Sequence, residues 1–136
     1  MRHVQEARRW IGTPWRHRGR QPGRRLDCVG LVVCALHAAG RPVKDRQVYG
    51  RDAEKDALRD ALMAEFGHPL PRDRAAPGDI ALFRGEAYPL HVGILGDYPL
   101  GGLSVIHACN APGVMRVTEH RLAGEWWDRL VEVYRV

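Results

Sequence analysis

The segment between residues 24 and 40, RRLDCVGLVVCALHAAG, constrains the fold of this chain more than any other. Residues 28–39 would be apolar on every side of a helix of about three turns, and a helix of that kind has to be buried in a core. Asp27 is a good N-cap for it, while Gly40 and Pro42 are typical of residues that follow a helix end. We therefore expect a central buried helix over residues 28–39.

Two other helices and five strands are expected from the pattern of apolar residues. One helix covers Val4–Ile11, and an amphipathic one covers residues 52–67, with an apolar face made of Leu58, Ala61, Leu62 and Phe66. The short β-rich runs lie between glycines and prolines, at residues 78–85, 90–96, 103–109, 113–120 and 129–136. Helices first and strands afterwards indicate an α+β fold, with the helices packed on a mostly antiparallel sheet. The chain of 136 residues shows no repeat or long linker, so we expect one domain over residues 1–136.

The chain is basic, with a formal net charge of +5, and only Lys44 and Lys55 of its 21 basic residues are lysines. Arginines cluster before the central helix, at Arg8, Arg9, Arg16, Arg18, Arg20, Arg24 and Arg25. Such a segment attracts an anionic partner, which leaves nucleic acid, an acidic polymer or a carboxylate-bearing substrate as alternatives. No nucleic-acid motif surrounds Trp10 or Trp15, so we expect no nucleic-acid partner.

Cys28 would occupy the first position of the central helix. The chain has three cysteines and no CxxC motif, which favours a reducing compartment over a disulfide framework. The free N–H groups and the dipole of a helix N-terminus stabilise a thiolate, so we expect a lowered pKa and a nucleophilic Cys28. The alternative is an inert core thiol, because free cysteines are often buried.

A nucleophilic cysteine needs a base, which is most often a histidine oriented by a third polar group. Of the seven histidines, His91 and His107 lie inside expected strands, LHVGIL and VIHAC. Strand alternation puts His91 on one face with Gly93, where another element can approach closely. His120 is set aside here because it lies next to a charged segment.

A zinc site is the competing interpretation of the same residues. Cys28, His91, His107 and Cys109 would together form a Cys₂His₂ set. Their spacing matches no zinc signature, and ligation would block the thiolate. We expect no metal and no other cofactor.

Several motifs resemble the NlpC/P60 cysteine peptidases of bacterial cell walls. The stretches DCVGLV, PGDIALF, HVGIL and VIHA occur in the order found in that family, and ARRWIGTPWRHRG upstream resembles its entry segment. The resemblance covers the chain from about Ala7 to Ala108. It implies a papain-like fold in which the helix of the nucleophile packs against an antiparallel sheet that carries both histidines.

The resemblance also implies roles for particular residues. Cys28 matches the nucleophile, His91 the general base, and His107 the residue that orients the imidazole. The implied reaction is hydrolysis of an amide bond in a peptidoglycan stem peptide, at the bond after γ-D-glutamate. No metal takes part in it.

Three more residues match positions near the substrate of such peptidases. Asp27 matches an aspartate that holds the free amine of the substrate. Val29 replaces a serine of many members, and Trp15 replaces a tyrosine. The sequence DCVGL after WIGTP resembles the NlpC/P60 proteins of tailed phages and gene transfer agents, which implies other tail proteins as partners. The alternative is a structural tail-assembly protein that keeps the peptidase fold with little or no activity.

The expected location follows from the same resemblance and from two absences. The N-terminus, MRHVQEARRW, contains no apolar segment of a secretory signal, and no apolar run approaches the ~20 residues of a membrane span. We expect a protein made in the cytoplasm and then associated with a virion or tail tip.

Overall fold

The computed structural model describes residues 1–47, 49, 56–85 and 89–136. Its helices are α1 (Arg2–Arg9), α2 (Cys28–Ala38), α3 (Ala57–Phe66) and α4 (Glu125–Arg129), with a 3₁₀ turn, η1 (Arg72–Arg74). Its strands are β1 (Arg20–Gln21), β2 (Arg25–Leu26), β3 (Leu70–Pro71), β4 (Ile80–Arg84), β5 (Leu90–Asp97), β6 (Leu103–Cys109), β7 (Arg116–Arg121) and β8 (Leu130–Tyr134).

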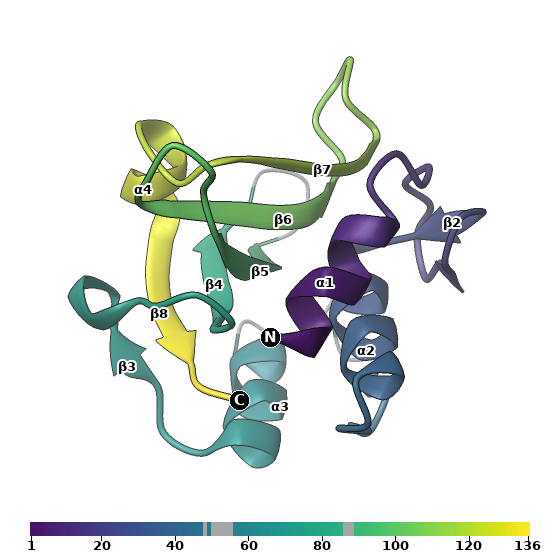
Figure 1. Ribbon diagram of the computed structural model, residues 1–136. Coiled ribbons are helices and arrows are strands. Elements are labelled where there is room, and N and C mark those ends of the chain that lie inside the picture. The colour runs from purple at the N-terminus through teal and green to yellow at the C-terminus, as the bar shows by residue number, and fades with distance from the viewer. Residues whose placement is uncertain (48, 50–55, 86–88) are drawn as a thin grey trace.

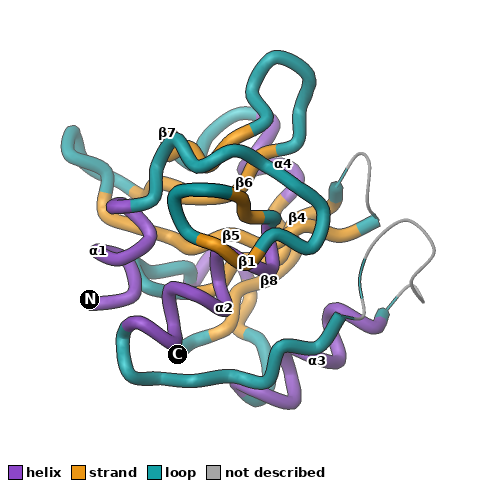
Figure 2. The backbone as a smooth tube through the Cα atoms, turned by 90° about the vertical axis from the view of Figure 1, so that its right-hand side faces the viewer, coloured by secondary structure: helices purple, strands orange, loops and turns teal. Residues whose placement is uncertain are grey.

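Six strands form one antiparallel sheet in the order β3-β8-β4-β5-β6-β7 (Figure 1). Helix α2 packs mainly on β5 and β6 in the middle of this sheet, and α1 packs on α2. Figure 2 shows α4 well apart from α1, α2 and α3. The expected α+β fold, with early helices on an antiparallel sheet, is confirmed.

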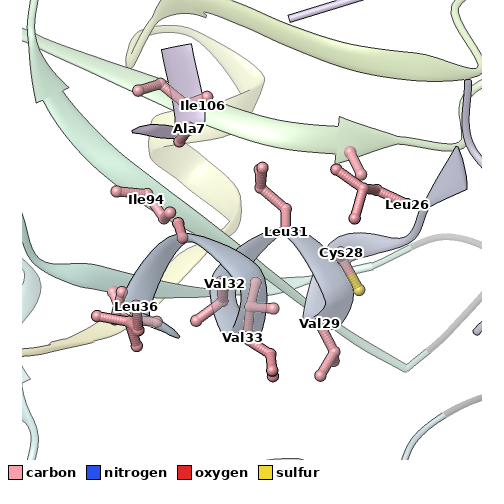
Figure 3. Close-up of a cluster of buried hydrophobic side chains, with 14 of the residues drawn as sticks. Ala7, Leu26, Cys28, Val29, Leu31, Val32, Val33, Leu36, Ile94 and Ile106 are labelled. Atoms are coloured by element: carbon pink, nitrogen blue, oxygen red, sulfur yellow. The ribbon is translucent and has the colours of Figure 1, made fainter. Parts of the chain in front are cut away.

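Helix α2 begins and ends close to where the sequence predicts. Asp27 has extended backbone dihedrals, and its side chain accepts a hydrogen bond from the Gly30 N–H, as an N-cap does. Gly40 follows the helix with a φ of 80°, a left-handed conformation that favours glycine. Nearly every residue of α2 is buried, and Figure 3 shows its side chains in one cluster with Ile94 and Ile106 of the sheet.

The opposite face of the sheet is buried too, which the sequence did not indicate. A second cluster of apolar residues lies there, and Trp126 and Trp127 of α4 pack against it. His91 is consequently only 8% exposed, although it points away from α2 as the alternation predicts. Strand alternation reports which side chains share a face, but it does not report whether a distant segment covers that face.

Other differences are local. The arginine-rich segment before α2 contains the two-residue strands β1 and β2, which pair with each other and which the sequence pattern did not indicate. The helix expected over residues 52–67 is found as Ala57–Phe66, and positions 52–55 of that expectation lie outside the described residues. Among the described helices, none has the length and apolar character needed to cross a membrane.

Candidate active site

Cys28 is the first residue of α2, and the preceding residue sets its position. The Oδ1 atom of Asp27 accepts a hydrogen bond of 2.8 Å from the Gly30 N–H. This cap turns the chain into the helix directly at Cys28, whose side chain is only 1% exposed. In Figure 3 its sulfur lies at the start of the helix, next to Val29.

The environment of Cys28 favours the neutral thiol. Burial raises the pKa of Cys28 to about 12, and the negative charge of Asp27 adds to this. The backbone N–H groups of Val92 and Val29 lower the pKa of the thiol, but by less than burial raises it. The sequence predicted a lowered pKa because of the helix N-terminus, and this prediction is wrong, since desolvation of the thiol outweighs the helix dipole.

His91 and His107 form a hydrogen-bonded pair on neighbouring strands. The Nε2 atom of His91 lies 2.8 Å from the Nδ1 atom of His107. Gly93 makes this approach possible, because a Cβ atom at that position would lie 3.2 Å from the His107 Cβ and 3.0 Å from the Val105 Cγ2. Burial lowers the pKa of His91 to about 4 and holds the pKa of His107 well below its usual value, so both rings are neutral at pH 7.

The backbone of Val92 connects the thiol to this histidine pair. Cys28 interacts with the Val92 N–H, and Val92 directly follows His91 in β5. Within the part of the chain that the structure describes, no hydrogen bond joins the Cys28 thiol to the His91 ring. Because His91 Nε2 is bonded to His107, Nδ1 is the ring nitrogen left to accept a thiol proton. The catalytic roles themselves stay predictions.

Two residues that the sequence did not assign to the site, His120 and Trp126, lie next to the histidine pair. The Nε2 atom of His120 lies 2.9 Å from the Nε2 atom of His107. Trp126 covers the histidines, with its ring centroid 5.8 Å from His91, 4.6 Å from His107 and 5.6 Å from His120. The expected strand over residues 113–120 could have indicated that His120 lies on a sheet face beside another strand. No sequence signal linked Trp126 to the histidines.

Asp27 is fully buried and is engaged by the chain itself. Besides the helix cap, its oxygens accept hydrogen bonds from Arg20 at 2.8 Å, from the Arg18 N–H at 2.7 Å and from the Tyr49 hydroxyl at 2.6 Å. An exchange of one of these partners would be needed before Asp27 could hold a substrate amine. Its observed contacts organise the arginine-rich segment around the start of α2.

Trp15 and Val29 occupy different places around α2. Trp15 is half-buried, packs against the core, and donates its backbone N–H to the Met115 carbonyl at 3.0 Å. Val29 is buried and lines an apolar groove between α2 and α3, together with Leu58 and Leu62. Trp15 is not among the described residues that line this groove.

A cleft opens on the side of His91 that faces α4. Its lining comprises Gly85, His91, Cys109, Asn110, Ala111, Trp126 and Arg129. Cys28 is absent from this lining as far as the described residues define it. The cleft therefore gives access to His91, the expected base, between α4 and the C-terminal ends of β4 and β6.

A metal site is not evident in this region. Across the described residues, no three His, Cys, Asp or Glu side chains are arranged so that they could hold a metal ion. The competing zinc interpretation would need Cys28 to join the histidines, whereas the ring nitrogens of His107 face two other histidines.

Comparisons with known proteins agree with this architecture. The crystal structure of the NlpC/p60 domain of the peptidoglycan hydrolase SagA is 26% identical, with a TM-score of 0.66 over 99% of this chain and 97% of that chain. A structure described as similar to a lipoprotein of the NLP/P60 family, from Staphylococcus aureus subsp. aureus Mu50, is 21% identical, with a TM-score of 0.65 over 99% of this chain and 40% of that one. NlpC1 from Trichomonas vaginalis is 17% identical, with a TM-score of 0.65 over 98% of this chain and 42% of that one.

This chain thus spans about two-fifths of the length of the last two proteins, and at those identities the likeness shows the fold alone. A search of curated protein sequences found no match. The model of the NlpC/P60 family matches residues 12–135, which is nearly the whole chain. The chain belongs to the NlpC/P60 family.

Proposed function

We propose that this protein is a cysteine peptidase that hydrolyses amide bonds in peptidoglycan stem peptides, at the bond after γ-D-glutamate. The observation that carries the proposal is the thiol of Cys28 at the N-terminus of a buried helix, against the strand of a histidine already paired with a second histidine. The family and the peptidoglycan hydrolase among its structural neighbours support the substrate class.

The proposed mechanism starts from neutral groups. Sγ of Cys28 attacks the carbonyl carbon while its proton passes to His91, so that thiolate forms only as the new S–C bond forms. The backbone N–H of Cys28, which has no acceptor within the helix, stabilises the oxyanion. The C–N bond then breaks as His91 returns the proton to the leaving amine, and water hydrolyses the thioester.

The cleft beside His91 suits the charge of such a substrate. Arg129 and Asn110 line it, and stem peptides carry carboxylates. A guanidinium at the wall of a cleft attracts a carboxylate and raises the local concentration of an anionic peptide. The net positive charge of the chain also attracts an anionic peptide.

The test is digestion of purified peptidoglycan, with the released fragments identified by mass spectrometry. We expect new fragments that end in γ-D-glutamate, and we expect Cys28→Ser to abolish them. Cys34→Ser is the matched control, because Cys34 lies on the same helix and is half-buried. Equal loss in both variants, or no release by the wild type, would contradict the proposal.

A role in a phage-type tail is the second part of the proposal, and it rests on the sequence resemblance. The structural alternative, a tail-assembly protein with little activity, is favoured by the 1% exposure of Cys28. Particles that assemble but no longer cleave the wall after Cys28→Ser would support the enzyme. Failed tail assembly on deletion, with Cys28→Ser behaving as wild type, would support the structural role.

A further inference from the structure

Three imidazole rings follow one another along this sheet face and end on a backbone carbonyl. His91 Nε2 lies 2.8 Å from His107 Nδ1, and His107 Nε2 lies 2.9 Å from His120 Nε2. The remaining nitrogen of His120, Nδ1, lies 3.0 Å from the carbonyl oxygen of Arg121. Within the part of the chain that the structure describes, each ring nitrogen along this row apart from His91 Nδ1 therefore has a hydrogen-bond partner.

In a row of neutral rings the carbonyl oxygen sets the direction of every hydrogen bond, because it can only accept. Nδ1 of His120 must carry a proton and donate it to Arg121. In a neutral ring the Nε2 of His120 is then an acceptor, so His107 donates from its own Nε2. The Nδ1 of His107 must accept in turn, which requires His91 to donate from Nε2.

The reverse direction is unfavourable for the same reason. If His120 donated from Nε2, its bare Nδ1 would face the lone pairs of the Arg121 oxygen. The row also requires neutral rings, since a protonated imidazole has no acceptor. Burial and the cover of Trp126 favour neutral rings at His91 and His107.

The pairing of β6 with β7 brings His120 to its place. In this register His107 faces Thr118, and Val105 faces His120. His120 is thus the diagonal neighbour of His107 on the same sheet face, within reach of a long side chain. Trp126 packs against both rings, and His107 is fully buried, so water is kept from the nitrogens of His107.

We propose that His120 is a positioning residue of the site, which sets the tautomer of His91 through His107 and so leaves His91 Nδ1 unprotonated to accept the Cys28 proton. This inference rests on the proposed function for its catalytic consequence, but the tautomers can be measured without substrate. His120 itself does not need to touch the reacting atoms. It acts by fixing which ring nitrogen carries the proton, first in His107 and then in His91.

The first experiment is ¹⁵N NMR of the histidine side chains in the wild-type protein near pH 7. We expect His91 and His107 as Nε2–H tautomers and His120 as the Nδ1–H tautomer. His120→Phe keeps a ring but removes the acceptor, so His107 should lose its fixed tautomer and His91 should populate the Nδ1–H form. His120→Gln should retain the wild-type pattern, because its amide can both accept from His107 and donate to Arg121.

Kinetics on a stem peptide provide the second readout. A wrongly protonated catalytic histidine lowers kcat by about 10⁴ in serine proteases. His120 acts one ring further away, so for His120→Phe we expect a fall in kcat of about ten- to a hundredfold, with KM within about twofold. His120→Gln should recover most of this loss, which a merely structural role would not explain.

The outcomes separate the two proposals. An Nδ1–H tautomer of His91 in the wild type would overturn the inference, as would unchanged tautomers and unchanged kcat in His120→Phe. Wild-type tautomers as expected, together with no hydrolysis of peptidoglycan by any variant, would leave the row of histidines in place and refute the proposed function.

Discussion

Replacing Asp27 by alanine tests whether this carboxylate is structural or contacts the substrate. The substitution removes the acceptor of the Gly30, Arg18 and Tyr49 donors and the buried partner of Arg20. The Asp27 side chain is 0% exposed, and the Arg20 side chain is 18% exposed. Water therefore cannot fully replace the lost carboxylate as the partner of Arg20.

The magnitude follows from these contacts. Removing one partner of a buried ion pair destabilises a protein by about 3–5 kcal/mol, and loss of an N-cap alone accounts for about 1 kcal/mol of that. Arg20 retains Asp45, at 2.8 Å, and Tyr49. We therefore expect the free energy of unfolding of Asp27→Ala to fall by about 3 kcal/mol, at the lower end of the range.

Urea unfolding followed by circular dichroism measures this change, and Asp45→Ala is the matched control. Asp45 pairs with the same arginine, but its side chain is 33% exposed, so its removal should change stability by about 1 kcal/mol or less. A loss below about 1 kcal/mol for Asp27→Ala, combined with a raised KM for a stem peptide, would refute the structural argument and favour a substrate contact.

Three further predictions concern the site. Alkylation of Cys28 by iodoacetamide should be slow at pH 7 and accelerate as pH rises, because burial raises the pKa of the thiol to about 12. Gly93→Ala should destabilise the protein by about 1–3 kcal/mol and lower kcat, since the new Cβ meets His107 and Val105 at 3.2 and 3.0 Å. The free energy of unfolding should fall as pH is lowered from about 6.5 toward 4, because the folded pKa of His91 is lowered to about 4 and the unfolded chain binds protons that the folded chain excludes. His91→Gln should make this pH dependence shallower.

Each of these has a clear contrary result. Fast alkylation of Cys28 at pH 6 would show a preformed thiolate, as the helix N-terminus alone suggests. A wild-type stability for Gly93→Ala would mean that β5 and β6 can separate without loss. An unchanged slope of stability against pH in His91→Gln would mean that this ring is not kept neutral by folding.

The sequence predicted the parts of the fold that depend on local pattern. The helix at Cys28 follows from a mainly apolar run behind a capping Asp27, and both features are local in the sequence. The faces of β5 follow from a period of two, which placed His91 and Gly93 together. The family resemblance rested on these same short motifs.

The sequence failed where the environment of a group comes from distant segments. The pKa of Cys28 moves opposite to the prediction because the core removes water from the thiol, and a helix terminus cannot show this in isolation. His120 was set aside because its neighbours in sequence are charged, whereas its neighbours in space are His107 and Trp126.

The amino-acid order of this chain thus specifies which residue begins the central helix and which side chains share a strand face, because those properties arise from contacts within a few residues. The row of three histidines arises from the register of β6 and β7 and from the packing of α4 over them. The donors around Asp27 come from the arginine-rich segment, and Cys28 is buried by elements that are distant in the sequence. Those depend on how separate elements pack, since exclusion of water and the direction of a hydrogen bond are set by neighbours in space.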